Sequence, residues 1–91
     1  AWIGAGVDHI TDRDLAQFGL KSKQGAIIHQ IVKGSPADKA GLQLMDVIVE
    51  VEGKPVRTPD ELVGLIVNSK IGKRIELKII RNKNEILTSI T

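Results

Sequence analysis

Few side chains in this sequence could do catalytic chemistry, and their spacing does not assemble an active site. His9 and His29 have no second histidine at metal-ligand spacing, and the chain has no cysteine, so no zinc pattern is present. No serine lies in a G-x-S-x-G elbow, and Ser35 is explained as a helix cap. We therefore expect no catalytic residue, no metal and no cofactor, and a chain that is not itself an enzyme.

The opening stretch AWIGAGVDHI combines apolar residues with two glycines and could bind an anion through its backbone. Gly4 and Gly6 begin a dinucleotide-type pattern, but His9 stands at the third glycine position and no helix follows at once. Glycine weakens a strand interior, so a backbone this bare is interpreted as a turn whose amides converge on a carboxylate. In this interpretation Gly4 frees the backbone, and the apolar side chains of the stretch form a pocket beside it.

Length and composition predict one globular domain over residues 1–91. Hydrophobic residues make up 42% of the chain and charged residues 26%, and the net charge is only +2. Trp2 and Phe18 are the only aromatic residues, so nucleic-acid binding is not expected. No apolar run reaches the ~18 residues of a membrane span, and no signal segment is present. The abrupt apolar start predicts a domain excised from a longer polypeptide.

Three helix starts share one pattern, a hydroxyl side chain followed three residues later by an acid. The hydroxyls are those of Thr11, Ser35 and Thr58. They predict helices over 12–18, 36–40 and 59–70, with Gly19 and Gly41 ending the first two. These helices alternate with the predicted strands.

Strand signals occupy the segments between the helices. Residues 25–32 form a β-branched run, and residues 75–90 predict a hairpin that turns at 82–84. Alternation places Ile75, Leu77 and Ile79 on one face of the hairpin's first strand. In the middle strand, alternation predicts one face for Val47, Val49 and Val51 and the other for Ile48, Glu50 and Glu52.

The order of these elements predicts an α+β, mainly β, fold. Short connections with antiparallel-type turns favour a partly open antiparallel barrel or sandwich of about five to six strands, capped by about two to three helices. Such a sheet has an open edge, and natural proteins usually cover an edge that they do not use. An extended peptide that adds a strand to this edge is therefore the expected ligand.

Over essentially its whole length the chain resembles the PDZ domain of bacterial HtrA/Deg-type serine proteases. The opening WIGAGVDHITDRDLAQFGL is similar to the binding turn, strand and first helix of that family. The centre GSPADKAGLQLMDVIVEVEGKPV resembles its G-S-P-A-x-x-A-G-L block, and the tail TPDELVGLIVNSKIGKRIELKIIRNKNE resembles its last helix and hairpin. The opening segment is what favours an HtrA-type parent, because the central block occurs in many bacterial PDZ domains.

The resemblance implies a peptide-binding site. Ile3, Gly4 and Ala5 correspond to the turn that holds the peptide's terminal carboxylate, and Val7, Asp8 and His9 correspond to the edge strand. Val63 and Val67 correspond to the opposite wall of the groove, and Trp2 and Gly6 complete the set. The i, i+4 spacing assigns Leu62 and Ile66 to the core. Alternatively, Val63 and Val67 are peripheral core.

The sequence departs from the family pattern at two positions. Met45 replaces the glycine before Asp46, so the turn there is expected to be built differently. Ala5 replaces a larger aliphatic residue, which predicts a roomier or shallower pocket. Asp46 is interpreted as a residue that organises this turn. The role of Trp2 is left open between shaping the turn and packing against a protease domain.

The resemblance also implies a function and a location. The domain would capture hydrophobic C-termini or extended segments of misfolded proteins for an attached serine endopeptidase of the periplasm or cell envelope, through which it could be part of an oligomer. One alternative is a module that contacts the protease domain and regulates assembly without binding substrate. Another is the PDZ domain of a membrane-embedded protease, a tail-specific protease or a secretion-system component.

Overall fold

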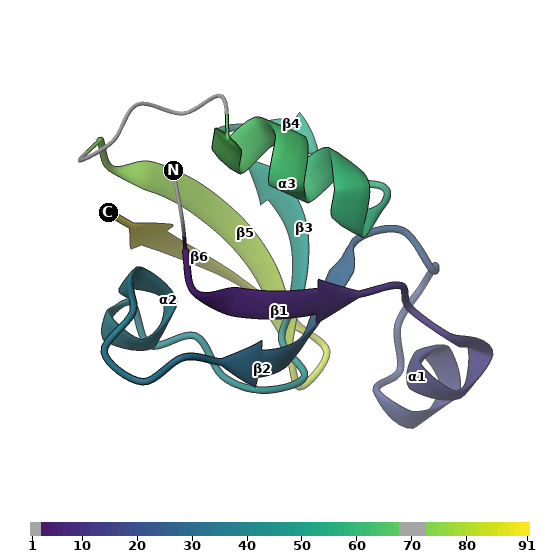
Figure 1. The fold of residues 1–91 in the computed structure, drawn as a ribbon. Coiled ribbons are helices and arrows are strands. Elements are labelled where there is room, and N and C mark those ends of the chain that lie inside the picture. The colour runs from purple at the N-terminus through teal and green to yellow at the C-terminus, as the bar shows by residue number, and fades with distance from the viewer. Residues whose placement is uncertain (1–2, 68–72) are drawn as a thin grey trace.

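The computed structural model describes residues 3–67 and 73–91. These residues form six strands and three helices, shown in Figure 1. In chain order they are β1 (Ala5–Asp8), α1 (Asp12–Gln17), β2 (Ala26–Ile31), α2 (Pro36–Lys39), β3 (Val47–Val51), β4 (Lys54–Pro55), α3 (Pro59–Val67), β5 (Ile75–Arg81) and β6 (Asn84–Ile90). Within these ranges, none of the helices has the length and apolar character that crossing a membrane requires.

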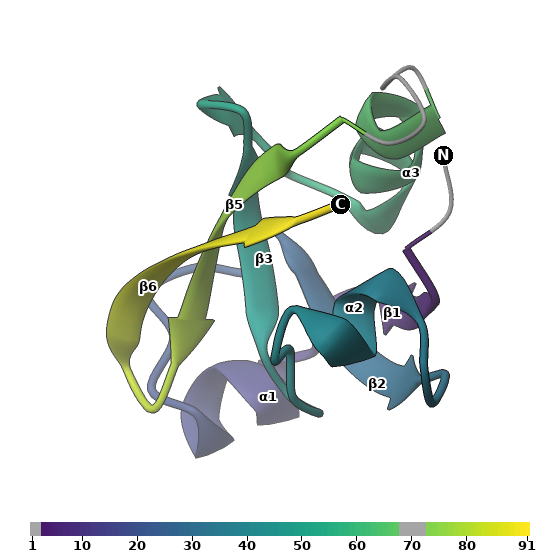
Figure 2. The same cartoon turned by 90° about the vertical axis from the view of Figure 1, so that its left-hand side faces the viewer.

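The strands form one antiparallel sheet in the order β1-β2-β3-β5-β6, with β4 paired to β3. The sheet curls, so that β1 and the β5–β6 hairpin lie at opposite ends of it and α3 lies over β1 in both views (Figures 1 and 2). The predicted fold class, a partly open antiparallel sheet with a few covering helices, is confirmed.

Two hydrophobic clusters lie on opposite faces of the sheet. The main core joins β2, β3 and β5 to α3 through residues such as Ile28, Ile48, Leu62 and Leu77, all of them at most 1% exposed. The second cluster contains Ile10, Ile27 and Val47, with Phe18 and Leu20 packed against it from the segment around α1. Because Ile10 is part of this cluster, the chain just beyond β1 is fixed to the body of the domain.

The predicted alternation of the middle strand is wrong beyond its first residues. Val47 belongs to the second cluster and Val49 packs against it, but Val51 lies with Ile48 in the main core. The pairing of β3 with β5 shifts register between Ile48 and Glu50. A bulge of this kind adds one residue to the strand, which moves every later side chain to the other face of the sheet. By contrast, Ile75, Leu77 and Ile79 are all buried in the main core, as predicted.

The helix boundaries follow the predicted caps. The Thr11 hydroxyl accepts from the amide of Asp14, the Ser35 hydroxyl from Asp38, and the Thr58 hydroxyl from Glu61. The first two helices end before Gly19 and Gly41, which have φ of 63° and 83°. The third helix is described to Val67, and the rest of its predicted range lies outside the described residues.

The turn before β3 is held by a buried ion pair. Met45 adopts φ 70°, the left-handed conformation that glycine adopts most readily. The Asp46 carboxylate, 2% exposed, accepts from the amide of Gln43 at 2.9 Å. It also accepts from Arg81 Nε at 2.9 Å and Nη2 at 2.7 Å, and Arg81 Nη2 donates to the carbonyl of Gly41. The hydrogen bond to Asp46 raises the pKa of Arg81. Asp46 thus organises the turn, as predicted.

We expect Gly64→Ala to stabilise the domain by about 0.5–1 kcal/mol, because Gly64 is exposed inside α3 and glycine is less favourable than alanine in a helix. An added Cβ would have no atom within 4 Å. Thermal unfolding followed by circular dichroism measures the change. As a control, Gly34→Ala also has open space but sits at φ +80°, so it should destabilise the domain. A lower melting temperature for Gly64→Ala would contradict the prediction.

Candidate functional site

β1 is an edge strand of the sheet, and its free edge faces α3 (Figure 1). No strand in residues 3–67 or 73–91 pairs with this edge. Ala5 pairs with Ile31, and one residue further out the amide of Val32 donates to the carbonyl of Gly4 at 2.8 Å. In an antiparallel ladder, hydrogen-bonded pairs alternate with pairs that are not hydrogen-bonded. Ala5–Ile31 is therefore a pair without hydrogen bonds, and the amide and carbonyl of Ala5 point away from β2. They are available to another strand.

The turn before β1 directs two consecutive amides away from the sheet. The carbonyl of Ile3 accepts from the amide of Ala37 at 2.8 Å, and the carbonyl of Gly4 accepts from Val32. In a planar trans peptide the N–H points opposite to the C=O of the same unit. The amides of Gly4 and Ala5 therefore point away from α2 and β2, toward the free edge. Gly4 is buried with φ 77°, a conformation that a side chain would strain.

An apolar groove lies between this turn, β1 and α3. Its volume is about 140 Å³, and it is lined by Ile3, Gly4, Ala5, Val7, Leu62, Val63, Ile66 and Val67. In α3, Leu62 and Ile66 are 1% and 4% exposed, whereas Val63 and Val67 are 51% and 60% exposed. The helix thus presents a buried floor and an exposed wall on one side, which is the division predicted from the spacing of its apolar residues.

The structure brings most of the predicted site residues together at the groove. Ile3, Gly4, Ala5, Val7, Val63 and Val67 all line it. The groove is also lined by Leu62 and Ile66, which the spacing assigned only to the core. Their positions next to Val63 and Val67 on the helix could have indicated that they contribute to the groove as well. The prediction that Ala5 makes the pocket roomier or shallower stays a prediction.

Three further predicted residues, Gly6, Asp8 and His9, do not line the groove. The predicted edge strand through His9 is one residue too long, because β1 ends at Asp8. There the carboxylate of Asp8 accepts from the amide of His9 at 2.7 Å, a local bond that competes with strand pairing. Gly6 lies in β1 opposite Gln30 but does not line the groove. Trp2 lies outside the described residues.

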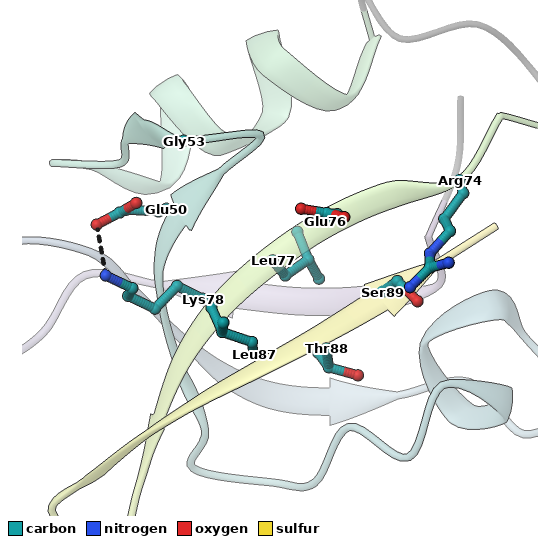
Figure 3. A pocket seen from close by; sticks show the side chains of 9 residues that line it. All are labelled: Glu50, Gly53, Arg74, Glu76, Leu77, Lys78, Leu87, Thr88 and Ser89. Atoms are coloured by element: carbon teal, nitrogen blue, oxygen red, sulfur yellow. Dashed lines mark hydrogen bonds and ion pairs between the residues drawn. The ribbon is translucent and has the colours of Figure 1, made fainter.

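A larger hollow lies on the outer face of β3, β5 and β6, and Figure 3 shows its lining. Its volume is about 750 Å³, and two of its charged side chains pair with each other: Lys78 Nζ lies 3.1 Å from Glu50 Oε2. This hydrogen bond, with the charges of Glu50 and Glu85, raises the pKa of Lys78. Leu87 is 78% exposed at its rim. Within the described ranges, no cluster of three or more His, Cys, Asp or Glu could hold a metal ion. The groove beside β1 is therefore the better candidate site.

The sequence matches proteins of known class. A protein-family model described as "PDZ domain" matches residues 2–91. The chain is 39% identical over 85 residues to "Probable periplasmic serine endoprotease DegP-like" of Hahella chejuensis, covering 92% of this chain and 18% of that protein. It is 39% identical over 77 residues to "Serine protease Do-like HtrA" of Bacillus subtilis, covering 84% of this chain and 17% of that protein. The chain thus spans less than a fifth of the length of these relatives.

Solved structures share the fold. The PDZ domain of HtrA3 bound to a phage-derived ligand, FGRWV, superposes with a TM-score of 0.83 at 24% identity, covering 99% of this chain and 82% of that one. The HtrA-type protease AlgW with a decapeptide superposes with a TM-score of 0.86 at 20% identity, covering 98% of this chain and 27% of that one. The family match over residues 2–91 includes the open edge of β1, the turn with its two outward amides and the apolar groove. The chain belongs to the PDZ domain family.

Proposed function

We propose that this chain is the peptide-binding module of an HtrA-type serine protease and captures hydrophobic C-termini by adding them as a strand to β1. The observation that carries the proposal is the pair of amides of Gly4 and Ala5, which point toward the end of an apolar groove beside an unpaired strand edge. Two converging backbone amides bind an anion, and a peptide's C-terminus carries one next to an apolar side chain.

The geometry sets the direction of the peptide. Its carboxylate accepts from Gly4 and Ala5, so the peptide ends where β1 begins and runs antiparallel to it. Its last side chain enters the groove, and the N–H of its last residue donates to the carbonyl of Ala5 at the free edge. Backbone pairing with one or two apolar anchors, offset by ordering of the peptide, gives micromolar affinity, about −7 to −8 kcal/mol. Both related structures described above carry a bound peptide or ligand, and the FGRWV ligand of HtrA3 ends in valine.

The proposal predicts that the free carboxylate is essential. We expect a decapeptide ending in valine to bind at least about tenfold more tightly than its C-terminally amidated copy, because a charge-assisted hydrogen bond is about twice as strong as a neutral one. Fluorescence anisotropy measures the affinities, and amide chemical shifts of Gly4 and Ala5 locate the contact. An N-terminally acetylated peptide is the control and should bind as the free peptide does. Equal affinities for the acid and the amide would refute capture of the C-terminus.

The rest of the protein is proposed from the relatives. These relatives are named as serine proteases, several of them periplasmic. We propose that residues 1–91 are a single domain of such a protease in the periplasm or cell envelope. Its partners are then hydrophobic or extended segments of misfolded substrates and the protease domain of the same chain, whose assembly this module would help regulate. The domain itself supplies recognition and no catalytic group.

A further inference from the structure

We propose that the free edge of β6 is a self-association site, where a second copy of this chain adds its own β6 in antiparallel orientation. This edge lies at the opposite end of the sheet from β1 (Figures 1 and 2). A dimer formed here therefore leaves the groove beside β1 open.

β6 is a long edge strand without the features that usually protect such an edge. Its pairing with β5 is continuous from Ile75–Ile90 to Arg81–Asn84, and its sequence, NEILTSI, contains no proline, lysine or glycine. Natural proteins protect edges with prolines, lysines or bulges, or keep the edge strand short. No strand within residues 3–67 or 73–91 pairs with the other side of β6. The edge is open to another strand.

The hairpin turn decides which backbone groups of β6 face the free edge. The two turn residues, 82–83, have φ of 51° and 68°, as in a type I′ hairpin, which is closed by a hydrogen-bonded pair. Here the closing pair is Arg81–Asn84. Hydrogen-bonded pairs alternate along the ladder with pairs that are not hydrogen-bonded. The amides and carbonyls that point away from β5 are therefore those of Glu85, Leu87 and Ser89.

The side chains of these three residues share the outer face of the sheet and form a strip with two different ends. Glu85 is the acidic end, and Leu87, 78% exposed, is the apolar centre. The other end is basic, because Figure 3 shows the guanidinium of Arg74 beside Ser89, and both residues line the same hollow. Such a strip is complementary to its own reverse.

A second β6, related by a two-fold axis through Leu87, matches this strip. Leu87 then pairs with the partner's Leu87, and Glu85 lies opposite the partner's Ser89 and close to the partner's Arg74. A parallel partner would instead bring the acidic ends together. β1 of another copy fits less well, because it has only four residues and a register shift. A second β6 is therefore the occupant that the strip favours.

Sedimentation velocity of the complete chain tests this proposal. One strand pair is smaller than a standard interface, so we expect a weak dimer, half-formed at about 0.1–1 mM. Leu87→Lys places like charges opposite each other at the axis and should weaken association at least about tenfold. The control Leu44→Lys makes the same change at another exposed leucine, outside β6, and should associate as the unmodified chain does.

Charge reversal tests the register of the two strands. Glu85→Arg faces the partner's Arg74 and should weaken association about fivefold, because the contact occurs twice in a dimer. Glu85→Arg/Arg74→Glu should restore it. Amide hydrogen exchange gives a local measurement: exchange at Leu87 should slow as the concentration rises, whereas Ile86, already bonded to β5, should not change.

Three outcomes would overturn the proposal. The first is a chain that stays monomeric at about 1 mM, and the second is a Leu87→Lys variant that associates as the unmodified chain does. The third is association that a saturating valine-terminated peptide abolishes, which would assign the contact to β1. Glu85, Leu87 and Arg74 are all exposed, so their variants should fold, and circular dichroism verifies this.

Discussion

Replacing Arg81 by methionine is expected to lower the free energy of unfolding by about 3–5 kcal/mol, because it leaves the buried carboxylate of Asp46 without its cation. The guanidinium makes two hydrogen bonds to Asp46 and one to the carbonyl of Gly41. It thereby ties the end of β5 to the turn before β3. At roughly 0.05–0.15 kcal/mol per residue, a chain of 91 residues is stabilised by roughly 5–14 kcal/mol, so the loss is a large part of the total.

Urea denaturation of both proteins measures this change. Lys78→Met is the matched control: it also removes one cation from β5, but its ion pair with Glu50 lies on the outer face of the sheet, where surface pairs contribute little. The double variant Asp46→Leu/Arg81→Met should be more stable than Arg81→Met alone, since it removes the buried charge. If Arg81→Met and Lys78→Met unfold at the same urea concentration, the turn does not depend on this ion pair.

The double variant Val63→Glu/Val67→Glu is expected to abolish peptide binding, a loss of more than about a hundredfold. Both valines are exposed on the groove side of α3, so the change should leave folding nearly intact. Each new glutamate places a polar group against the apolar surface of the peptide, which costs about 1–3 kcal/mol of binding free energy. The two carboxylates also repel the peptide's terminal carboxylate. Anisotropy with the valine-terminated decapeptide measures the affinity, and circular dichroism confirms the fold.

The control for this variant makes the same change of charge elsewhere. Leu44 and Leu87 are 56% and 78% exposed and do not line the groove. Leu44→Glu/Leu87→Glu should therefore bind the peptide with affinity close to that of the unmodified chain. Retained binding in Val63→Glu/Val67→Glu would place the peptide somewhere other than between β1 and α3.

Features that depend on neighbours in the chain were predictable from the sequence. The caps at Thr11, Ser35 and Thr58 form as expected, since a hydroxyl and the amide that it accepts from are only three residues apart. The main faces of α3 and β5 also follow from periodicity, because regular helices and strands repeat their faces at fixed intervals. The family resemblance then supplied the positions of the turn and the groove wall.

Features that depend on pairing between distant segments were not predictable. The bulge in β3 arises where β3 pairs with β5, and it moves Val51 to the main core. No residue type within the strand indicates this bulge. The partner of Asp46 is Arg81, thirty-five positions along the chain, and only the packing of β5 against the turn brings them together.

The sequence by itself determined the helix starts, the strand runs and a bare, apolar turn at the opening, because these depend on local geometry and composition. Only the tertiary structure decided which way that turn faces. The carbonyls of Ile3 and Gly4 accept hydrogen bonds from the amides of Ala37 and Val32, and the fold brings these two residues beside the turn. Because each peptide unit is planar, these two bonds direct the amides of Gly4 and Ala5 toward α3, and the turn becomes one end of a groove.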